Sequence, residues 1–298
     1  TRREGTDFRG DTRTNTSPAT ETGRWAQGGH GADRLSVNSE LPTRAGWAQL
    51  APEKDGGRIR RSMAARRLSI GDAQAQKREQ QAQPIRLLPG ARPRRAAAPT
   101  FAAAGQSTQM IVGADGASDA TILATSAQLY GAYRLKRVYY SAFSPIPHAS
   151  ATLPAQAPPL LREHRLYQAD WLLRFYGFDV KEIVEDVPGQ GGMLDLDIDP
   201  KLAWALRHPD RFPVDLNTAP RELLLRVPGL GARNVQRIVD SRRQGKLRVA
   251  DLARLRAPLQ KLLPFVVLLD HHPRQRLDDP ARLRRELAPA PRQADLFG

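Results

Sequence analysis

The spacing of apolar residues predicts alternating strands and helices in the middle part of the chain. A short, mostly apolar run predicts a buried strand over 108–112, and a second strand is expected over 137–143. Apolar residues at helical spacing predict helices over 119–133 and 159–176. A strand–helix–strand–helix order is typical of parallel βαβ units, so we expect an α/β architecture here.

Weaker signals precede this region. Residues 35–41 alternate between apolar and polar side chains, as a strand with one buried face does, and a short helix is expected over 45–50. A further helix is predicted over 60–83, and a Pro/Arg-rich stretch follows it. Residues 58–95 hold eleven basic and two acidic side chains. We therefore interpret 58–99 as an Arg-rich linker, with contact to phosphate groups as its alternative role.

From residue 200 onward every segment has helical periodicity, and a glycine-rich turn interrupts it within the stretch RVPGLGARNVQRIV. Helices are predicted over 221–226 and 232–243, each with one apolar stripe. The proline of the turn cannot continue the first helix, whereas Gly229 and Gly231 allow positive φ and let the chain reverse. A plain helical hairpin needs only one such glycine, so the second requires an explanation.

An anion that approaches the backbone of the turn would explain the second glycine. The first N–H groups of a helix lack intrahelical partners and lie at the positive end of its dipole, so they can donate to a phosphate oxygen. Residues 217–256 carry ten basic and three acidic side chains, and the whole chain has a net charge of +15. This charge favours a polyanionic partner, nucleic acid before membrane. The alternative is a helical hairpin with a solvated basic face.

The residues around this turn resemble the helix-hairpin-helix DNA-binding family. The resemblance rests on LNTA at 216–219, Leu223-Leu224, VPGLG at 227–231, Ile238, Arg242-Arg243, Gly245 and Asp251-Leu252, followed by a second helical pair. It implies binding to the backbone of double-stranded DNA without sequence preference, through hairpin N–H groups and nearby basic side chains. The DNA contacts are assigned to Val227, Pro228, Gly229, Leu230, Gly231, Ala232, Arg233, Asn234 and Arg237.

The α/β part resembles a bacterial radical SAM family described as DNA modification or repair proteins, whose members end in a helix-hairpin-helix region. The matching segments are 32–55, 104–123, 137–147 and 161–178. The resemblance implies an α/β partial (β/α) barrel followed by an all-α helix-hairpin-helix domain, with S-adenosylmethionine and a 4Fe-4S cluster at the strand ends. The cofactor-binding candidates are Asn38, Glu40, Gln109 and Ser141. Their alternative role is ordinary hydrogen bonding to loops.

The sequence departs from that family because it has no cysteine. The family holds its cluster with three closely spaced cysteines in an amino-terminal barrel segment that is missing here. We therefore expect no cofactor, no catalytic residue and no metal on this chain as given. Two hypotheses follow: a DNA-binding protein with an inactive, incomplete barrel, or a DNA modification or repair enzyme that lost its cluster-binding segment by truncation or frameshift. A helical interaction protein with a basic surface is a third.

These signals divide the chain into four regions. We expect a disordered or unrelated amino-terminal segment over 1–32, the incomplete barrel with its linker over 33–188, the hairpin domain over 189–270 and a flexible tail over 271–298. The chain has no run approaching 18 apolar residues, so we expect a soluble, cytoplasmic and nucleoid-associated protein without a membrane partner.

The predicted tail contains QADLF, which resembles the short peptide by which bacterial repair and replication proteins dock on the DNA sliding clamp. The clamp contact is assigned to Gln293, Asp295, Leu296 and Phe297. In that peptide the apolar pair fills a pocket and the Gln side chain hydrogen-bonds at its rim. A chance match is the alternative, because five residues recur easily.

Two further clusters carry weaker signals. The pair His271-His272 has no carboxylate or thiol at ligand spacing, so a metal site is not expected there. Asp195, Asp197 and Asp199 alternate with apolar residues as a strand with one wet face would. Three carboxylates on one face can bind a divalent ion, but we expect a solvated edge or a helix-entry loop instead.

Overall fold

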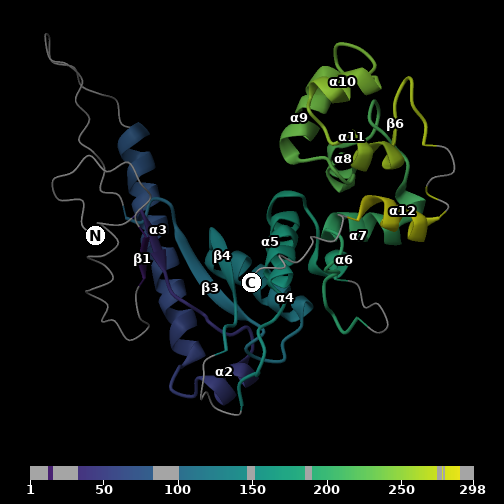
Figure 1. Ribbon diagram of the computed structural model, residues 1–298. Helices are drawn as coiled ribbons and strands as arrows, with labels where there is room; N and C mark the ends of the chain where they lie inside the picture. The colour runs from purple at the N-terminus through teal and green to yellow at the C-terminus, as the bar shows by residue number, and fades with distance from the viewer. Residues whose placement is uncertain are drawn as a thin grey trace, which may run out of the picture. The chain divides into compact units, whose positions relative to one another are not determined.

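The structure is a computed structural model that describes residues 13–15, 33–82, 101–145, 152–184, 190–273, 277 and 279–288. The chain forms two compact units, one of residues 1–117 with 124–159 and the other of residues 118–123 with 160–298. From the sequence we expected the boundary between the two domains to lie between residues 188 and 189, later in the chain than the structure has it. The first unit contains a four-stranded sheet, and the second contains short helices and a two-stranded sheet (Figure 1).

Four parallel strands form the sheet of the first unit. In order across the sheet they are β1 (Arg13–Asn15), β2 (Arg34–Ser36), β3 (Gln106–Val112) and β4 (Arg137–Ala142). The strands predicted over 108–112 and 137–143 are confirmed, with ends that shift by one or two residues. The sheet is open within the described residues, and the partial barrel stays a prediction.

Strand β2 is shorter than the alternation over 35–41 predicted. After Ser36 the chain leaves the ladder, and Glu40, with a φ of 59°, rejoins β3 by one bridge to Met110. Thr108 of β3 occupies the gap, because its hydroxyl donates to Val37 O at 2.6 Å and accepts the Ser39 N–H at 2.9 Å. A buried side chain therefore fills the gap in backbone pairing at the end of β2.

Helices cover one face of this sheet. The helices of the unit are α2 (Arg44–Leu50), α3 (Gly56–Ala82) and, from residue 124 onward, α4 (Asp119–Tyr133). Gln106 of β3 joins α3 and α4, because its Nε2 donates to Met63 O at 3.1 Å and to Tyr133 O at 2.8 Å. On the same face the Tyr140 hydroxyl lies 2.9 Å from the Ser126 hydroxyl of α4. The helices predicted over 45–50 and 119–133 are confirmed.

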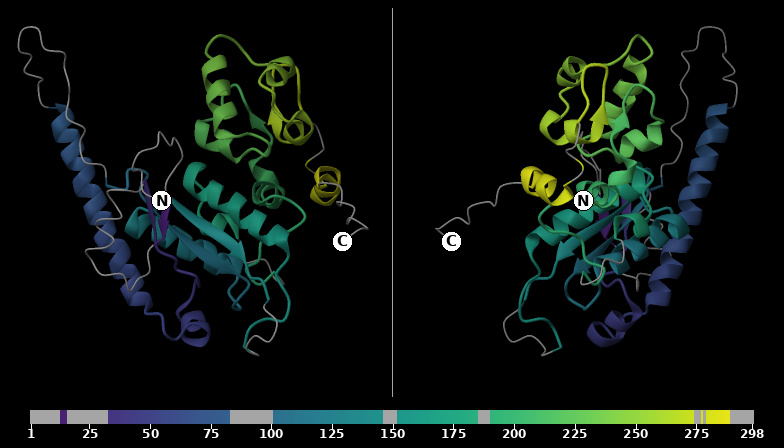
Figure 2. Two further views of the ribbon diagram at one scale, coloured as in Figure 1. Left: turned by 60° about the vertical axis from the view of Figure 1, so that its left-hand side comes forward. Right: turned by 90° about the vertical axis from the view of Figure 1, so that its right-hand side faces the viewer.

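Helix α3 confirms the helix predicted over 60–83 and corrects the linker predicted over 58–99. It begins four residues before the predicted start and is continuous for 27 residues (Figure 2). The predicted linker is therefore helical as far as Ala82, and its remainder lies outside the described residues. Ile59, Met63 and Ile70 are buried and hold α3 in place. Arg66 is also only 1% exposed, and burial lowers its pKa to about 10.

The second unit consists of short helices and two short strands. Its helices are α5 (Leu160–Phe175), α6 (Val180–Ile183), α7 (Pro200–Arg207), α8 (Arg221–Arg226), α9 (Ala232–Ser241), α10 (Val249–Arg254), α11 (Leu259–Leu262) and α12 (Pro280–Leu287). The prediction that every segment after residue 200 is helical is wrong at β5 (Val214–Asp215) and β6 (Val266–Val267), which pair in parallel. Strands of two residues are too short for a periodicity to reveal them.

An aromatic cluster forms the core beside α7. The Trp204 ring packs edge-on against Phe178 and Phe212, with ring centroids 5.4 and 6.1 Å apart. Phe212 packs in the same way against Phe265, at 5.2 Å. All four side chains are buried. Edge-to-face packing of this kind stabilises a core beyond the area that it buries, so the cluster gives the short helices a rigid support.

The buried carboxylate of Asp119 holds helix α5. It accepts a hydrogen bond from Arg162 Nε at 2.7 Å and another from the Leu194 N–H at 2.9 Å. Asp119 is fully buried and Arg162 nearly so. A charge in such a place must be paired and hydrogen-bonded, as this one is. The pairing fixes α5, which confirms the helix predicted over 159–176, against the loop before α7.

The alternating aspartates form a helix-entry loop, one of the two structures that we expected. Asp199 is the N-cap of α7 and accepts the Leu202 N–H at 3.0 Å. The Asp195 carboxylate accepts the N–H groups of Asp197 and Ile198 at 2.9 and 3.2 Å. Among the described residues, no group of three His, Asp or Glu side chains could hold a metal ion.

The flexible tail predicted over 271–298 is wrong for the residues of α12. Asp279 caps this helix by accepting the Arg282 N–H at 2.8 Å, and Leu283 is only 2% exposed. Arg284 Nη2 donates to Asp195 at 3.0 Å and to Asp197 at 2.9 Å, which ties α12 to the entry loop. The sequence did not predict this helix, because its single buried leucine is surrounded by arginines and gives no apolar periodicity. The clamp-like residues 293–297 lie outside the described part.

Candidate nucleic-acid interface

Helices α8 and α9 form the predicted hairpin, and the turn between them has the reversal that the sequence indicated (Figure 1). The turn closes through the Leu230 N–H, which donates to Val227 O at 3.2 Å. Gly229 has a φ of 82°, a conformation that favours glycine. A side chain at Gly229 would also bring its Cβ within 3.1 Å of Pro258. The fold itself therefore requires this glycine.

Gly231 differs from the prediction, because its φ is −89° and other residues adopt that conformation freely. Among the described residues, a Cβ at this position would meet nothing closer than the Tyr176 hydroxyl, at 3.7 Å. Gly231 is the N-cap of α9 and supplies no side-chain cap. Within the described chain, the N–H groups of Ala232, Arg233 and Asn234 find no acceptor. A missing side chain thus leaves three donors open to an anion.

The structure separates the basic residues near the turn into two sets. Arg233 and Arg237 are exposed, lie one helical turn apart on α9, and pair with no described residue. Arg226 instead forms an ion pair with Glu182 at 2.9 Å and lies 4.7 Å from the Phe178 ring. Arg242 donates to carbonyl oxygens of the loop before α8. Of these four arginines, Arg233 and Arg237 are therefore the ones available to bind phosphate.

A buried lysine supports the turn from beneath, and sequence patterns did not single it out. Lys201 Nζ donates to Leu230 O at 2.6 Å and lies 4.7 Å from the Tyr176 ring. Burial lowers the pKa of Lys201 to about 7, while the neighbouring Asp199 opposes this shift. Lys201 is one of two basic residues in the short helix α7, so no spacing or composition distinguishes it in the sequence.

Local side-chain bonds and one bond to a distant segment hold the start of the hairpin. Asp215 accepts the Asn217 N–H at 2.8 Å and the Thr218 hydroxyl at 2.9 Å. The Asn217 side-chain oxygen accepts the Leu247 N–H at 2.7 Å, which joins this loop to the segment that follows α9. Pro220 is the N-cap of α8, and no side chain caps that helix. These bonds fix the angle at which α8 enters the turn.

A second helical pair follows the hairpin, as the resemblance implied. Helices α10 and α11 are joined by a turn in which Arg256 has a φ of 54°. The Asp251 carboxylate accepts the Arg248 N–H at 2.9 Å and caps α10. Helix α11 has only four residues, and the turn before it contains no glycine.

The four cofactor-binding candidates have different side-chain contacts, although Glu40 adjoins Gln109, because its N–H donates to Gln109 O at 2.9 Å. Gln109 and Ser141 lie on the same half-buried face of the sheet, because Gln109 is opposite Tyr139 and Ser141 is two residues further along β4. Glu40 instead forms an ion pair with Lys54. Asn38 accepts a long bond of 3.5 Å from the Ser36 hydroxyl. Since the chain has no cysteine, its residues do not fit a 4Fe-4S cluster.

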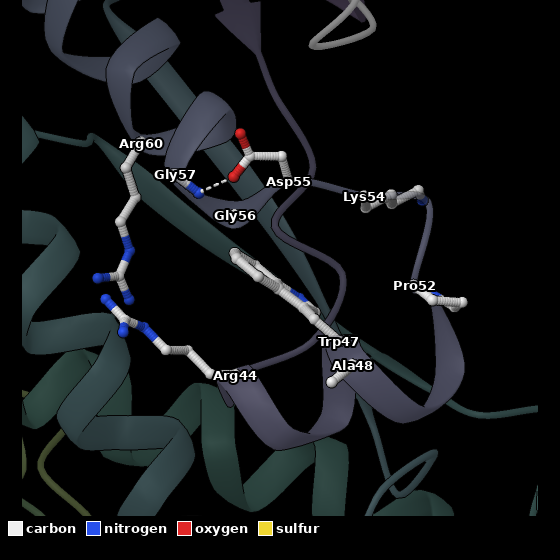
Figure 3. A pocket seen from close by; sticks show the side chains of 9 residues that line it. All are labelled: Arg44, Trp47, Ala48, Pro52, Lys54, Asp55, Gly56, Gly57 and Arg60. Carbon is white, nitrogen blue, oxygen red and sulfur yellow. Dashed lines mark hydrogen bonds between the residues drawn. The ribbon is translucent and has the colours of Figure 1, made fainter.

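A basic cavity of about 450 Å³ lies in the first unit at the start of α3. The guanidinium groups of Arg44 and Arg60 point toward each other across it, and the Trp47 ring forms its wall (Figure 3). Neither arginine has a partner in the described part of the chain. The Asp55 carboxylate is occupied, because it accepts the Gly57 N–H at 2.7 Å. Two facing cations without a carboxylate between them provide a site for an anion.

Comparison with known proteins gives no match: no protein-family model matches the chain, and no matching curated protein or solved structure is found. In the described helices, no segment is both long and apolar enough to cross a bilayer.

Proposed function

We propose that this chain binds double-stranded DNA without sequence preference, and that residues 227–234 with Arg237 hold phosphates of one strand. One observation supports this most directly: the fold does not require glycine at Gly231, yet the position adjoins three N–H groups without acceptors. Contacts of this kind give affinity and register but do not read bases. Such a protein would associate with the nucleoid.

For the α/β unit we propose the incomplete barrel of the radical SAM architecture, inactive in this chain. The open parallel sheet with helices on one face supports this, since a partial (β/α) barrel is built from the same repeating unit. Without cysteine ligands on this chain, no chemistry is assigned to S-adenosylmethionine or a cluster here.

Substitution of Gly231 tests the DNA-binding proposal. Gly231→Val should fold normally, because φ is −89° and the added Cβ has room. Its side chain would cover the α9 donors, so we expect affinity for a duplex to fall by about tenfold or more in a gel-shift titration. Gly245→Val is the matched control, since a Cβ at Gly245 meets no described atom within 4 Å.

The same titrations test the arginines. Arg233→Ala/Arg237→Ala should lower affinity for all sequences alike and reduce the slope of log K against log salt by about two, one per lost phosphate contact. If Gly231→Val binds the duplex with wild-type affinity and keeps its melting temperature, the DNA-binding proposal is contradicted. The alternative, a helical hairpin with a solvated basic face, would then hold.

A further inference from the structure

A cavity of about 520 Å³ lies beside the DNA-binding turn, entirely within the second unit. One wall is a face of α5, where His164, Tyr167, Gln168 and Trp171 recur at helical spacing. Residues 229–231 of the turn form another part of the wall. The volume is in the range of pockets that hold small organic groups. A ligand seated here would therefore lie next to a phosphate bound at the turn.

Aromatic rings give this cavity flat faces. Trp171 is 51% exposed although it is a large apolar side chain, and its ring contacts Phe175 with 4.5 Å between centroids. Tyr167 and Tyr176 also line the cavity. A half-exposed tryptophan at the edge of a cavity offers a surface on which a planar ring can stack, and such stacking accepts any base.

The polar groups of the cavity favour a neutral ligand with a hydrogen-bond acceptor. Arg165 Nη1 donates to Gln168 Oε1 at 2.8 Å, which orients the amide so that its NH₂ group is the free end. No described residue accepts from that NH₂ group. The cations at the rim are occupied, because Lys261 pairs with Asp199 and Lys201 donates to the turn. An anion would gain little inside this cavity, whereas a planar ring with a carbonyl or ring nitrogen matches it.

We propose that this cavity binds one unpaired nucleobase of the strand whose phosphate contacts the turn. The base stacks on Trp171, and its acceptor edge receives a hydrogen bond from the Gln168 amide. The inference rests on the proposed function, since Gly231 borders both the cavity and the open donors of α9. A paired base cannot enter, because it stays stacked in the duplex, so the site selects DNA with a bulged or unpaired nucleotide.

Two duplexes test this, one fully paired and one with a single bulged 2-aminopurine nucleotide. The full chain should bind the bulged duplex about tenfold more tightly at fixed salt. Trp171→Ala should abolish that preference and leave affinity for the paired duplex unchanged, while Trp171→Phe should keep part of it. Leu160→Ala is the matched control, because Leu160 is 66% exposed on the same helix and does not line the cavity. Fluorescence of the 2-aminopurine should fall on binding to wild type and not to Trp171→Ala.

The outcomes separate this inference from the proposed function. Equal affinity for the two duplexes, or a preference that survives in Trp171→Ala, overturns the base site and leaves DNA binding intact. Absence of binding to either duplex overturns the proposed function and the base site with it. Circular dichroism of each variant checks the fold: with unchanged spectra, a lost preference belongs to the cavity.

Discussion

Lys201 is the residue whose environment departs most from its ordinary chemistry. It is 7% exposed, and burial is the main reason that its pKa falls to about 7. The positive charges of Lys261 and Arg226 lower the pKa further, and Asp199 raises it. A neutral amine still donates hydrogen bonds, so the contact with Leu230 O persists when the proton is lost. The turn is therefore held by a group that titrates near neutral pH.

We predict that Lys201→Met removes a pH dependence of stability. In the unfolded chain the pKa of this amine is about 10.4, so between pH 7 and pH 10 only the unfolded state carries its proton. The free energy of unfolding of the wild type then rises with pH, by at most about 1.4 kcal/mol per pH unit. Below pH 7 both states carry the proton, and the folded state bears the full cost of a buried charge.

Urea unfolding of wild type and Lys201→Met at pH 7, 8 and 9 measures this. The stability of the wild type relative to the variant should increase steadily with pH. Lys246→Met provides the control, because Lys246 is exposed and its substitution should shift stability equally at each pH. A difference between wild type and Lys201→Met that stays constant over this range would contradict the prediction.

At the scale of elements, helix boundaries were predictable where prolines mark them. Helix α8 has the predicted ends, because Pro220 precedes it and Pro228 stops its continuation. Helix α12 was missed because its burial depends on Leu283 alone and its anchor is a pair of aspartates almost ninety residues earlier. Partners so distant in sequence leave no local signal.

The position of the candidate site in the chain was predictable from the sequence. Which of its residues are free to bind phosphate and which serve the fold was not. The motif placed the turn and its open donors, yet it treated all nearby arginines alike. Arg226 is withdrawn from the surface by Glu182, which lies 44 residues earlier, whereas Arg233 has no such partner among the described residues. The two glycines also have different roles. Gly229 allows the positive φ that the turn requires, and Gly231 leaves the space in front of the α9 donors open. Both distinctions depend on tertiary contacts.

The start of α3 gives a prediction of its own, since the Arg-rich segment had phosphate contact as an alternative role. If the cavity between Arg44 and Arg60 takes a DNA phosphate, Arg44→Ala/Arg60→Ala should weaken binding and reduce the salt slope by about one or two. Arg61 is the control, because it is exposed and already pairs with Asp55 at 3.2 Å. An Arg61→Ala variant should bind almost as wild type. If the slope of log K against log salt is unchanged in Arg44→Ala/Arg60→Ala as well as in Arg61→Ala, the segment does not contact DNA and forms a solvated face.

At the scale of the whole molecule, the positive charge and the clamp-like peptide both favour the proposed role at DNA. The chain carries a net charge of +15, and unpaired arginines occur in both units. Electrostatic contacts of this kind weaken steeply as salt rises and do not fix a protein at one sequence. A protein that binds DNA in this way gains from a second, uncharged tether to the replication or repair machinery, and residues 293–297 provide a candidate.

We predict that a peptide of residues 290–298 binds the bacterial sliding clamp weakly. Burial of Leu296 and Phe297 in an apolar pocket would contribute roughly 3–5 kcal/mol before ordering costs, which is less than the about 8 kcal/mol of a micromolar complex, so we expect a weak tether that also needs contacts from the rest of the peptide. Gln293 would add a hydrogen bond at the rim of that pocket. Titration calorimetry against purified clamp should show saturable heat, and a peptide with Leu296→Ala/Phe297→Ala should show none. If both peptides give equal heats, or neither gives any at high micromolar concentration, the clamp is not a partner of this segment.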